Sequence, residues 1–391
     1  MTARHLQRLA SGQATNPHKA TSRVLQRQFG HPVAELLGPL GSHGQSVDAG
    51  ADWASGEDDD MRRRTLLLGA VVSGMVAGAE PVRRSLDAAL ALHTTVRDVA
   101  DWERTVDEYA RLSAQARVSR DQLLPHLLAD LDEVRTHLAA ADGSLRPALA
   151  GVCARLSGLA AVALVSAGYW SEAARYWRTA QRAARSSDDR DLSGHIGGRR
   201  AIFSLYGPGG TASTLRIADD VLAETGGKPS SGTASALGAR AQVLALEGDR
   251  AGAHSTLSEL EHVFDELGDA IRSDPTMWGW SEHRLHHTRS FVHSYLGNTR
   301  DAGPAQDAAL ALCSPRSLAV AQVKFHQAAC MIVSGDVVQG THHVAEVYES
   351  LAPGHRNGHM STSAMFALNK VPAQAARLRA LREVRELVSS A

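Results

Sequence analysis

The sequence is poor in aromatic residues, in cysteine and in net charge. Aromatic residues make up 5% of its 391 residues, and three cysteines occur. Lys and Arg number 41 against 42 for Asp and Glu, which gives a formal net charge of −1. This balance produces no overall field that would favour nucleic acid or a membrane surface as a partner. Any contact with DNA must therefore come from a local basic segment.

The cysteine content excludes a disulfide framework. Cys153, Cys313 and Cys330 are an odd number, lie in alanine-rich apolar surroundings and include no Cys-x-x-Cys pair. Buried, reduced thiols in a cytoplasmic protein are the expected state.

Motifs for catalysis and cofactor binding are also lacking. The sequence contains no nucleophile elbow, P-loop, dinucleotide-binding glycine run or His-Glu-x-x-His motif. Gly-Pro-Gly-Gly at 207–210 predicts a turn, because the Lys-Ser/Thr of a phosphate loop does not follow it. We expect no enzymatic activity and no cofactor.

Strand patterns are rare, and helical patterns dominate. Few stretches combine β-branched residues with alternating polarity, whereas apolar residues recur at three- and four-residue steps from about residue 86 onward. The sequence therefore predicts an all-α fold.

A repeated turn organises residues 86–391. Five times a helical pattern ends at a glycine and a second one follows, with 38 to 49 residues between successive glycines. These glycines are Gly168, Gly207, Gly248, Gly297 and Gly335. The surrounding pattern, A-x-x-L-x-x-x-G-x-[WDN]-x-x-A, resembles tetratricopeptide (TPR) repeats. Its best copy contains Gly168, Tyr169, Trp170, Ala173, Ala174 and Tyr176, and Gly248, Asp249, Ala251 and Ala253 make the next.

The resemblance implies a TPR-like α-solenoid with longer helices than usual. The period exceeds the 34 residues typical of TPR repeats, and the proline that closes each repeat is mostly absent. Residues 371–390 predict the polar capping helix that such an array needs. A general all-α bundle remains the alternative.

The N-terminal part divides by charge. Residues 1–40 carry five basic residues and one acidic residue, whereas residues 41–60 carry six acidic residues. This shift indicates a basic module followed by an acidic linker.

The basic module contains a further pattern. Ser11-Gly12-Gln13-Ala14-Thr15-Asn16-Pro17-His18 predicts a turn, a helix over 20–29 follows, and Gly30-His31-Pro32-Val33-Ala34-Glu35-Leu36-Leu37 comes next. This order resembles the second half of a helix-turn-helix (HTH) domain of the phage-repressor type, the XRE family. With the "RRRTLL" segment near residue 62, it is similar to actinobacterial regulators that join such a domain to a helical, TPR-like body.

The resemblance implies DNA binding through the start of the chain. Residues 4–8 would be the recognition helix, and the implied DNA-contacting residues are Arg4, His5, Gln7, Arg8, Asn16 and His18. Two preceding helices of such a domain have no counterpart, so we expect the start of this sequence to truncate the HTH module. DNA is the implied partner if that module is complete. A basic helical hairpin with no role in DNA binding is the alternative.

Residues 61–85 have two interpretations. Arg62-Arg63-Arg64 and the apolar run after them have the outline of an export signal over 61–80, which a start at Met61 would favour. Acidic residues precede the arginines, and the run is shorter than the roughly 20 residues that span a bilayer. We expect an apolar linker helix and no membrane segment.

Three groups of residues are candidates for binding. Arg199, Arg240 and Arg289 each precede their turn glycine by eight residues, so stacked repeats would place them in a column that binds an anion or pairs with acidic neighbours. His283 and His287, four residues apart on a helix, are a weak candidate for a metal site. Trp278 and Trp280 would line a pocket or fix the longest connection to the core.

The predicted function is that of a transcriptional regulator with a helical body for sensing and homodimerisation. That body would bind a peptide, a small molecule or a protein in its groove. The alternative is a TPR-like interaction scaffold that does not bind DNA, for which residues 1–60 would be dispensable.

Overall fold

The computed structural model describes residues 96–114, 120–314 and 317–389. All regular structure in these ranges is helical, with no β-strand among the described residues, which confirms the predicted all-α class. The described residues belong to one compact unit, Ala88–Ala391. The predicted HTH module at 1–40, acidic linker at 41–60 and apolar linker helix at 61–85 lie outside them.

Fifteen α-helices and two short 3-10 helices occupy the described ranges. Their bounds are α5 Val96–Ala114, α6 Arg120–Ala140, α7 Leu145–Ser166, α8 Trp170–Arg185, α9 Leu192–Ser204, α10 Gly210–Thr225, α11 Ser231–Glu247, α12 Arg250–Asp265, α13 Asp269–Ser273, α14 Glu282–Tyr295, α15 Thr299–Ala311, α16 Leu318–Val333, α17 Val337–Glu349, η2 Pro353–His355, α18 Gly358–Leu368, η3 Ala373–Ala375 and α19 Arg379–Ser389.

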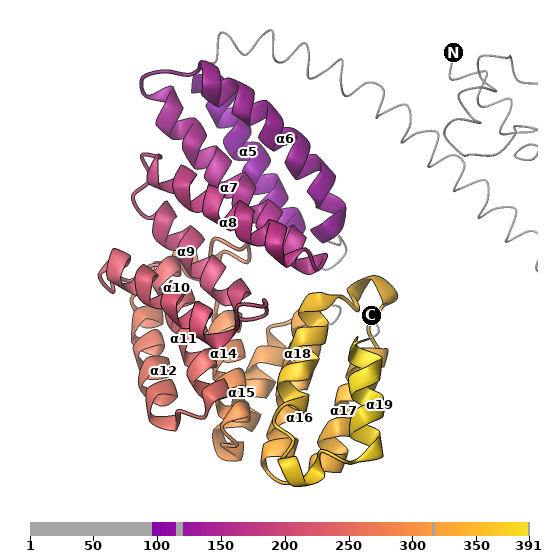
Figure 1. Cartoon of the computed structure of the whole chain (residues 1–391). Coiled ribbons are helices and arrows are strands. Elements are labelled where there is room, and N and C mark those ends of the chain that lie inside the picture. The colour runs from indigo at the N-terminus through magenta and orange to yellow at the C-terminus, as the bar shows by residue number, and fades with distance from the viewer. Residues whose placement is uncertain (1–95, 115–119, 315–316, 390–391) are drawn as a thin grey trace, which may run out of the picture. The chain divides into compact units, whose positions relative to one another are not determined.

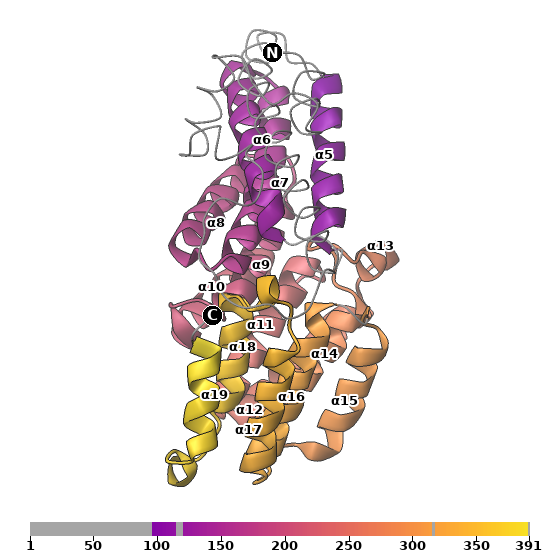
Figure 2. The same ribbon diagram turned by 90° about the vertical axis from the view of Figure 1, so that its right-hand side faces the viewer.

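From α7 onward the helices pack as pairs of sequence neighbours (Figure 1). The pairs are α7 with α8, α9 with α10, α11 with α12, α14 with α15, α16 with α17, and α18 with α19. The first helix of each pair also contacts the first helix of the next, so α7, α9, α11, α14, α16 and α18 form one continuous row. Figure 2 shows the last pairs of this row from the side.

Most predicted turn glycines stand where the sequence placed them. Gly168, Gly248, Gly297 and Gly335 have φ values of 85°, 81°, 69° and 102°, which side chains rarely allow. The fifth turn differs, because the residue with positive φ between α9 and α10 is Gly210, at 63°, and not Gly207. The Gly-Pro-Gly-Gly segment offers several glycines, and sequence spacing alone does not select among them.

Helices α9 and α11 cross with their backbones in contact. A Cβ atom built on Gly232 would lie 2.5 Å from both the carbonyl carbon and the oxygen of Gly194. A Cβ on Gly198 would in turn collide with the Gly232 carbonyl oxygen. Glycine is therefore required on both helices for this approach.

The last helices contact elements far away in the sequence. Helix α18 packs against α7, and a Cβ on Gly358 would lie 3.5 Å from the Cα of Gly168. Lys370 donates hydrogen bonds to the carbonyl oxygens of Ala245 and Leu246 at 3.3 and 2.9 Å. These carbonyls close α11, where a positive charge is favourable.

One helix of the described part, α7, is long and apolar enough to cross a membrane. Of its most apolar window, 83% is buried inside the protein. Because the central helix of a folded domain meets the same criteria, α7 is weak evidence for a membrane span. Its buried side chains, among them Leu149, Leu156 and Leu159, belong to the apolar core that also contains Trp177 and Phe203.

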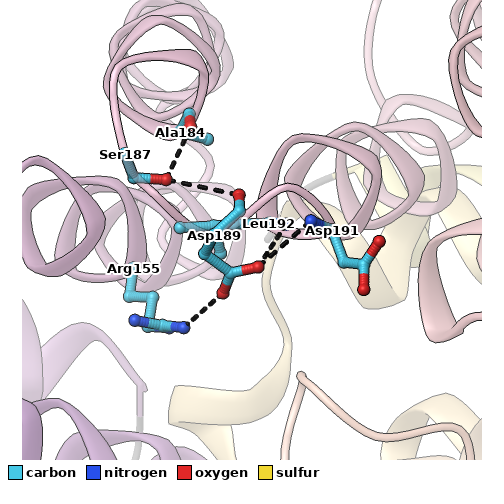
Figure 3. A network of polar contacts seen from close by, with 6 residues as sticks. All are labelled: Arg155, Ala184, Ser187, Asp189, Asp191 and Leu192. Carbon is cyan, nitrogen blue, oxygen red and sulfur yellow. Dashed lines mark hydrogen bonds and ion pairs between the residues drawn. The ribbon is translucent and has the colours of Figure 1, made fainter. Parts of the chain in front are cut away.

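A polar network fixes the connection between α8 and α9 (Figure 3). One carboxylate oxygen of Asp189 accepts hydrogen bonds from the backbone N–H groups of Asp191 and Leu192, each at 3.1 Å. The other accepts from Arg155 of α7 at 2.8 Å. Ser187 Oγ donates to the carbonyl oxygen of Ala184 at 2.7 Å. Asp189 thus caps the start of α9 and ties it to α7.

We expect Asp189→Ala to lower the free energy of unfolding by about 1.5 kcal/mol, since it removes both the cap and a partly exposed ion pair. Asp189→Asn keeps an oxygen acceptor for the backbone and loses only the ion pair, so its cost should stay near or below ~0.5 kcal/mol. Urea denaturation at 25 °C measures both. Equal losses in the two variants would show that the cap contributes nothing.

Candidate functional site

A cavity of about 610 Å³ lies beside the row of first helices. We call it the inner cavity. Helices α9, α11, α14, α16 and α18 all contribute to its wall, together with the connections before α14 and α16. Its size is in the range of sites that hold small organic ligands. The inner cavity therefore depends on several pairs at once, and no single pair forms it.

Helical spacing explains how α9 presents its side chains to the cavity. Arg199 and Phe203 are four residues apart, and Tyr206 follows three residues later, so they share a face. All three are buried, with 9%, 6% and 6% of their surface exposed. The Arg199 guanidinium carbon lies 5.3 Å from the centre of the Phe203 ring. Burial raises the pKa of Tyr206, which keeps its phenol protonated.

Histidines of α14 line the opposite part of the wall. His283 and His287 lie one turn apart, with ring centres 5.9 Å apart. Cys313 Sγ lies 3.0 Å from His283 Nε2. Burial lowers the pKa of His283, and it lowers the pKa of His287 well below the ordinary value. Both imidazoles are therefore neutral near pH 7.

Two more histidines lie next to this pair. The His326 ring centre is 4.8 Å from that of His287, and its Nδ1 is 2.9 Å from Ser290 Oγ. Burial lowers the pKa of His326 to about 3. His359 of α18 packs edge-on against Tyr206 at 4.3 Å and lies 3.3 Å from the Gln322 amide nitrogen.

Several buried polar atoms in the wall lack a hydrogen-bond partner. They are Gln242 Oε1, His287 Nε2 and Trp280 Nε1. Gln242 is 3% exposed and Trp280 is 1% exposed. Such atoms are uncommon in folded proteins because each costs free energy. Three of them in the lining of one cavity indicate a place where a ligand completes the polar contacts.

A second cavity, of about 410 Å³, lies among α12, α14 and α15. Its wall includes His254 and His293, whose ring centres are 5.5 Å apart. Arg289 and Glu261, also in this wall, form an ion pair at 3.0 Å. Its principal charges are therefore already paired.

The three arginines of the expected column lie in different places. Arg199 lines the inner cavity, Arg289 pairs with Glu261 in the second cavity, and Arg240 lies 3.4 Å from Asp219 of α10. The pairing with acidic neighbours that the sequence left open thus occurs at Arg240 and Arg289.

The other predicted residues also have definite places. His283 and His287 both line the inner cavity, and the described part of the chain holds no group of three or more His, Cys, Asp or Glu side chains suited to a metal ion. Trp280 lines the cavity as well and is buried in the core. Arg4, His5, Gln7, Arg8, Asn16 and His18 lie outside the described residues. The three cysteines are free thiols.

Sequence reasoning missed five residues of the site: Phe203, Tyr206, Gln242, Gln322 and His359. Gln242 left a usable signal, since it is a lone amide in the apolar, alanine-rich sequence of α11. The others come together only through contacts between separate pairs, which no local pattern encodes.

Comparison of the chain with protein-family models, with curated proteins and with solved structures finds no match. The function must therefore be argued from the geometry of the inner cavity and from the N-terminal sequence.

Proposed function

We propose that the chain is a transcriptional regulator whose helical body, a TPR-like α-solenoid, senses a ligand in the inner cavity. The observation that carries the proposal is this cavity, walled by five first helices and lined by buried polar atoms without partners. A ligand there contacts several pairs together, so its binding is coupled to their packing. The N-terminal resemblance supports DNA as the target of that coupling.

The row of first helices supports the solenoid assignment. Each first helix contacts the next, and each second helix packs on its own partner. This is how helix-pair repeats build an extended inner surface for binding. Homodimerisation through the same body remains part of the proposal, and light scattering on the purified chain measures it.

DNA binding is tested with the 391-residue chain and with a form extended upstream at its genomic locus. Binding sites are first selected from a random-sequence DNA library. Fluorescence anisotropy then measures affinity at two salt concentrations. We expect tighter binding at low salt and a loss of about tenfold or more in Arg4→Ala and Arg8→Ala, since a base-reading arginine contributes about 1–3 kcal/mol.

Arg135→Ala is the matched control, because Arg135 is an exposed arginine of α6 that pairs with Asp132. It should bind DNA like the wild type. If neither form of the chain shows salt-sensitive binding, the regulator proposal is wrong. The interaction scaffold is then the better description, and deletion of residues 1–60 should leave the phenotype intact.

A further inference from the structure

The inner cavity has a positive wall. Of the residues that line it, Arg199, Arg272 and Arg284 are positive and Glu282 is negative. Arg272 is paired with Asp269 at 2.6 Å, and the Glu282 side chain is turned to solvent, with 64% of its surface exposed. The remaining balance favours an anion inside the cavity, where the dielectric is lower than in water.

Arg199 is the charge best placed to receive such an anion. It is 9% exposed, whereas Arg284 is used at the rim, where it donates to the carbonyl oxygens of Thr276 and Gly279. The Arg199 guanidinium lies near the Phe203 ring, which orients its plane. A planar guanidinium binds a carboxylate through two parallel hydrogen bonds.

The other groups of the wall define the rest of the ligand. Phe203, Tyr206 and Trp280 offer aromatic surface. Gln242 brings a buried amide whose oxygen has no partner, and an amide can serve as donor or acceptor. A volume of about 610 Å³ holds a small organic molecule and not a folded helix of a partner protein.

We propose that the inner cavity binds a small aromatic carboxylate. Arg199 and Gln242 hold the carboxylate, and the flat ring lies among Phe203, Tyr206 and Trp280. This inference rests on the proposed function, because it names the chemistry of the molecule that the helical body senses.

The test uses two probes of the same shape, naphthalene-2-carboxylate and naphthalene-2-carboxamide, with the full chain at pH 7.5. Isothermal titration calorimetry measures affinity, and saturation-transfer NMR detects weak contacts. We expect the carboxylate to bind at least tenfold more tightly than the amide, which corresponds to about 1.4 kcal/mol. Arg199→Gln should abolish this preference, and Arg199→Lys should retain part of it.

Arg240→Gln is the matched control, since it makes the same replacement outside the cavity, at an arginine that pairs with Asp219. It should keep the full preference. Ala319→Trp fills the cavity from the start of α16 and should block both probes. This variant keeps the test decisive if Arg199→Gln does not fold, because preference in the wild type and loss in Ala319→Trp together locate the carboxylate.

Two results would overturn the inference. If both probes bind alike and Ala319→Trp blocks them, the cavity binds a ligand that is not selected by charge, and the proposed function stands. If neither probe binds at 1 mM, the aromatic carboxylate is wrong. The proposed function is then decided separately by the DNA-binding measurement, which uses no ligand.

Discussion

Gly232→Ala is expected to lower the melting temperature of the protein by about 6–10 °C, from a loss of about 3 kcal/mol in the free energy of unfolding. The added methyl group would lie 2.5 Å from the Gly194 carbonyl. Backbone atoms cannot rotate aside as a side chain can, so α9 and α11 must separate. Because both helices contribute to the inner cavity, that separation also disturbs its wall.

Gly303→Ala is the matched control for this prediction. Gly303 also lies inside a helix, α15, but a Cβ there meets nothing within 4 Å. Alanine stabilises an open helical position by about 0.5–1 kcal/mol relative to glycine. Differential scanning calorimetry should show the two variants shifting in opposite directions. A similar shift in both would contradict the close approach of α9 and α11.

The second large effect concerns acid. Burial holds the pKa of His326 at about 3, below the ordinary value of 6.5. Between these values the unfolded chain binds a proton that the folded protein does not, so the free energy of unfolding falls as pH falls below about 6.5. His326 alone should cost about 2 kcal/mol at pH 5 relative to neutral pH. The lowered pKa of His287 acts in the same direction.

His326→Asn separates this effect from general acid sensitivity. Its amide oxygen can take the place of Nδ1 and keep the hydrogen bond to Ser290, but it does not titrate. We expect the variant to be less stable at pH 7.5, because packing against Phe291 is lost. Its further loss between pH 7.5 and 5 should be smaller than that of the wild type by about 2 kcal/mol. Urea denaturation at both pH values measures this, and equal losses would exclude His326 as the cause.

The sequence carried the fold class and most turns because these are local properties. A glycine with positive φ after an apolar helix marks its end, as Gly168 and Gly248 show. The site was only partly accessible in this way. Arg199, His283 and His287 were found from spacing along single helices, whereas Tyr206 and His359 meet at 4.3 Å from elements 153 residues apart in the chain.

Burial was the other quantity that spacing did not provide. Arg199 and Arg240 occupy equivalent positions before their turns, yet one is 9% exposed and the other has a side chain 42% exposed. Their different surroundings arise from the crossing of each first helix with its neighbours. A column argument assumes identical crossings, and the glycine contact of α9 with α11 shows that the crossings differ.

The hydrogen bonds of Lys370 have a consequence for the order of synthesis. Helix α11 is complete in sequence once Glu247 has been added, but the ammonium group that closes its C-terminal end comes 125 residues after Ala245. The contact of α18 with α7 likewise joins a late helix to an early one. On the ribosome, the early pairs must therefore wait for the last ones before their native contacts are complete.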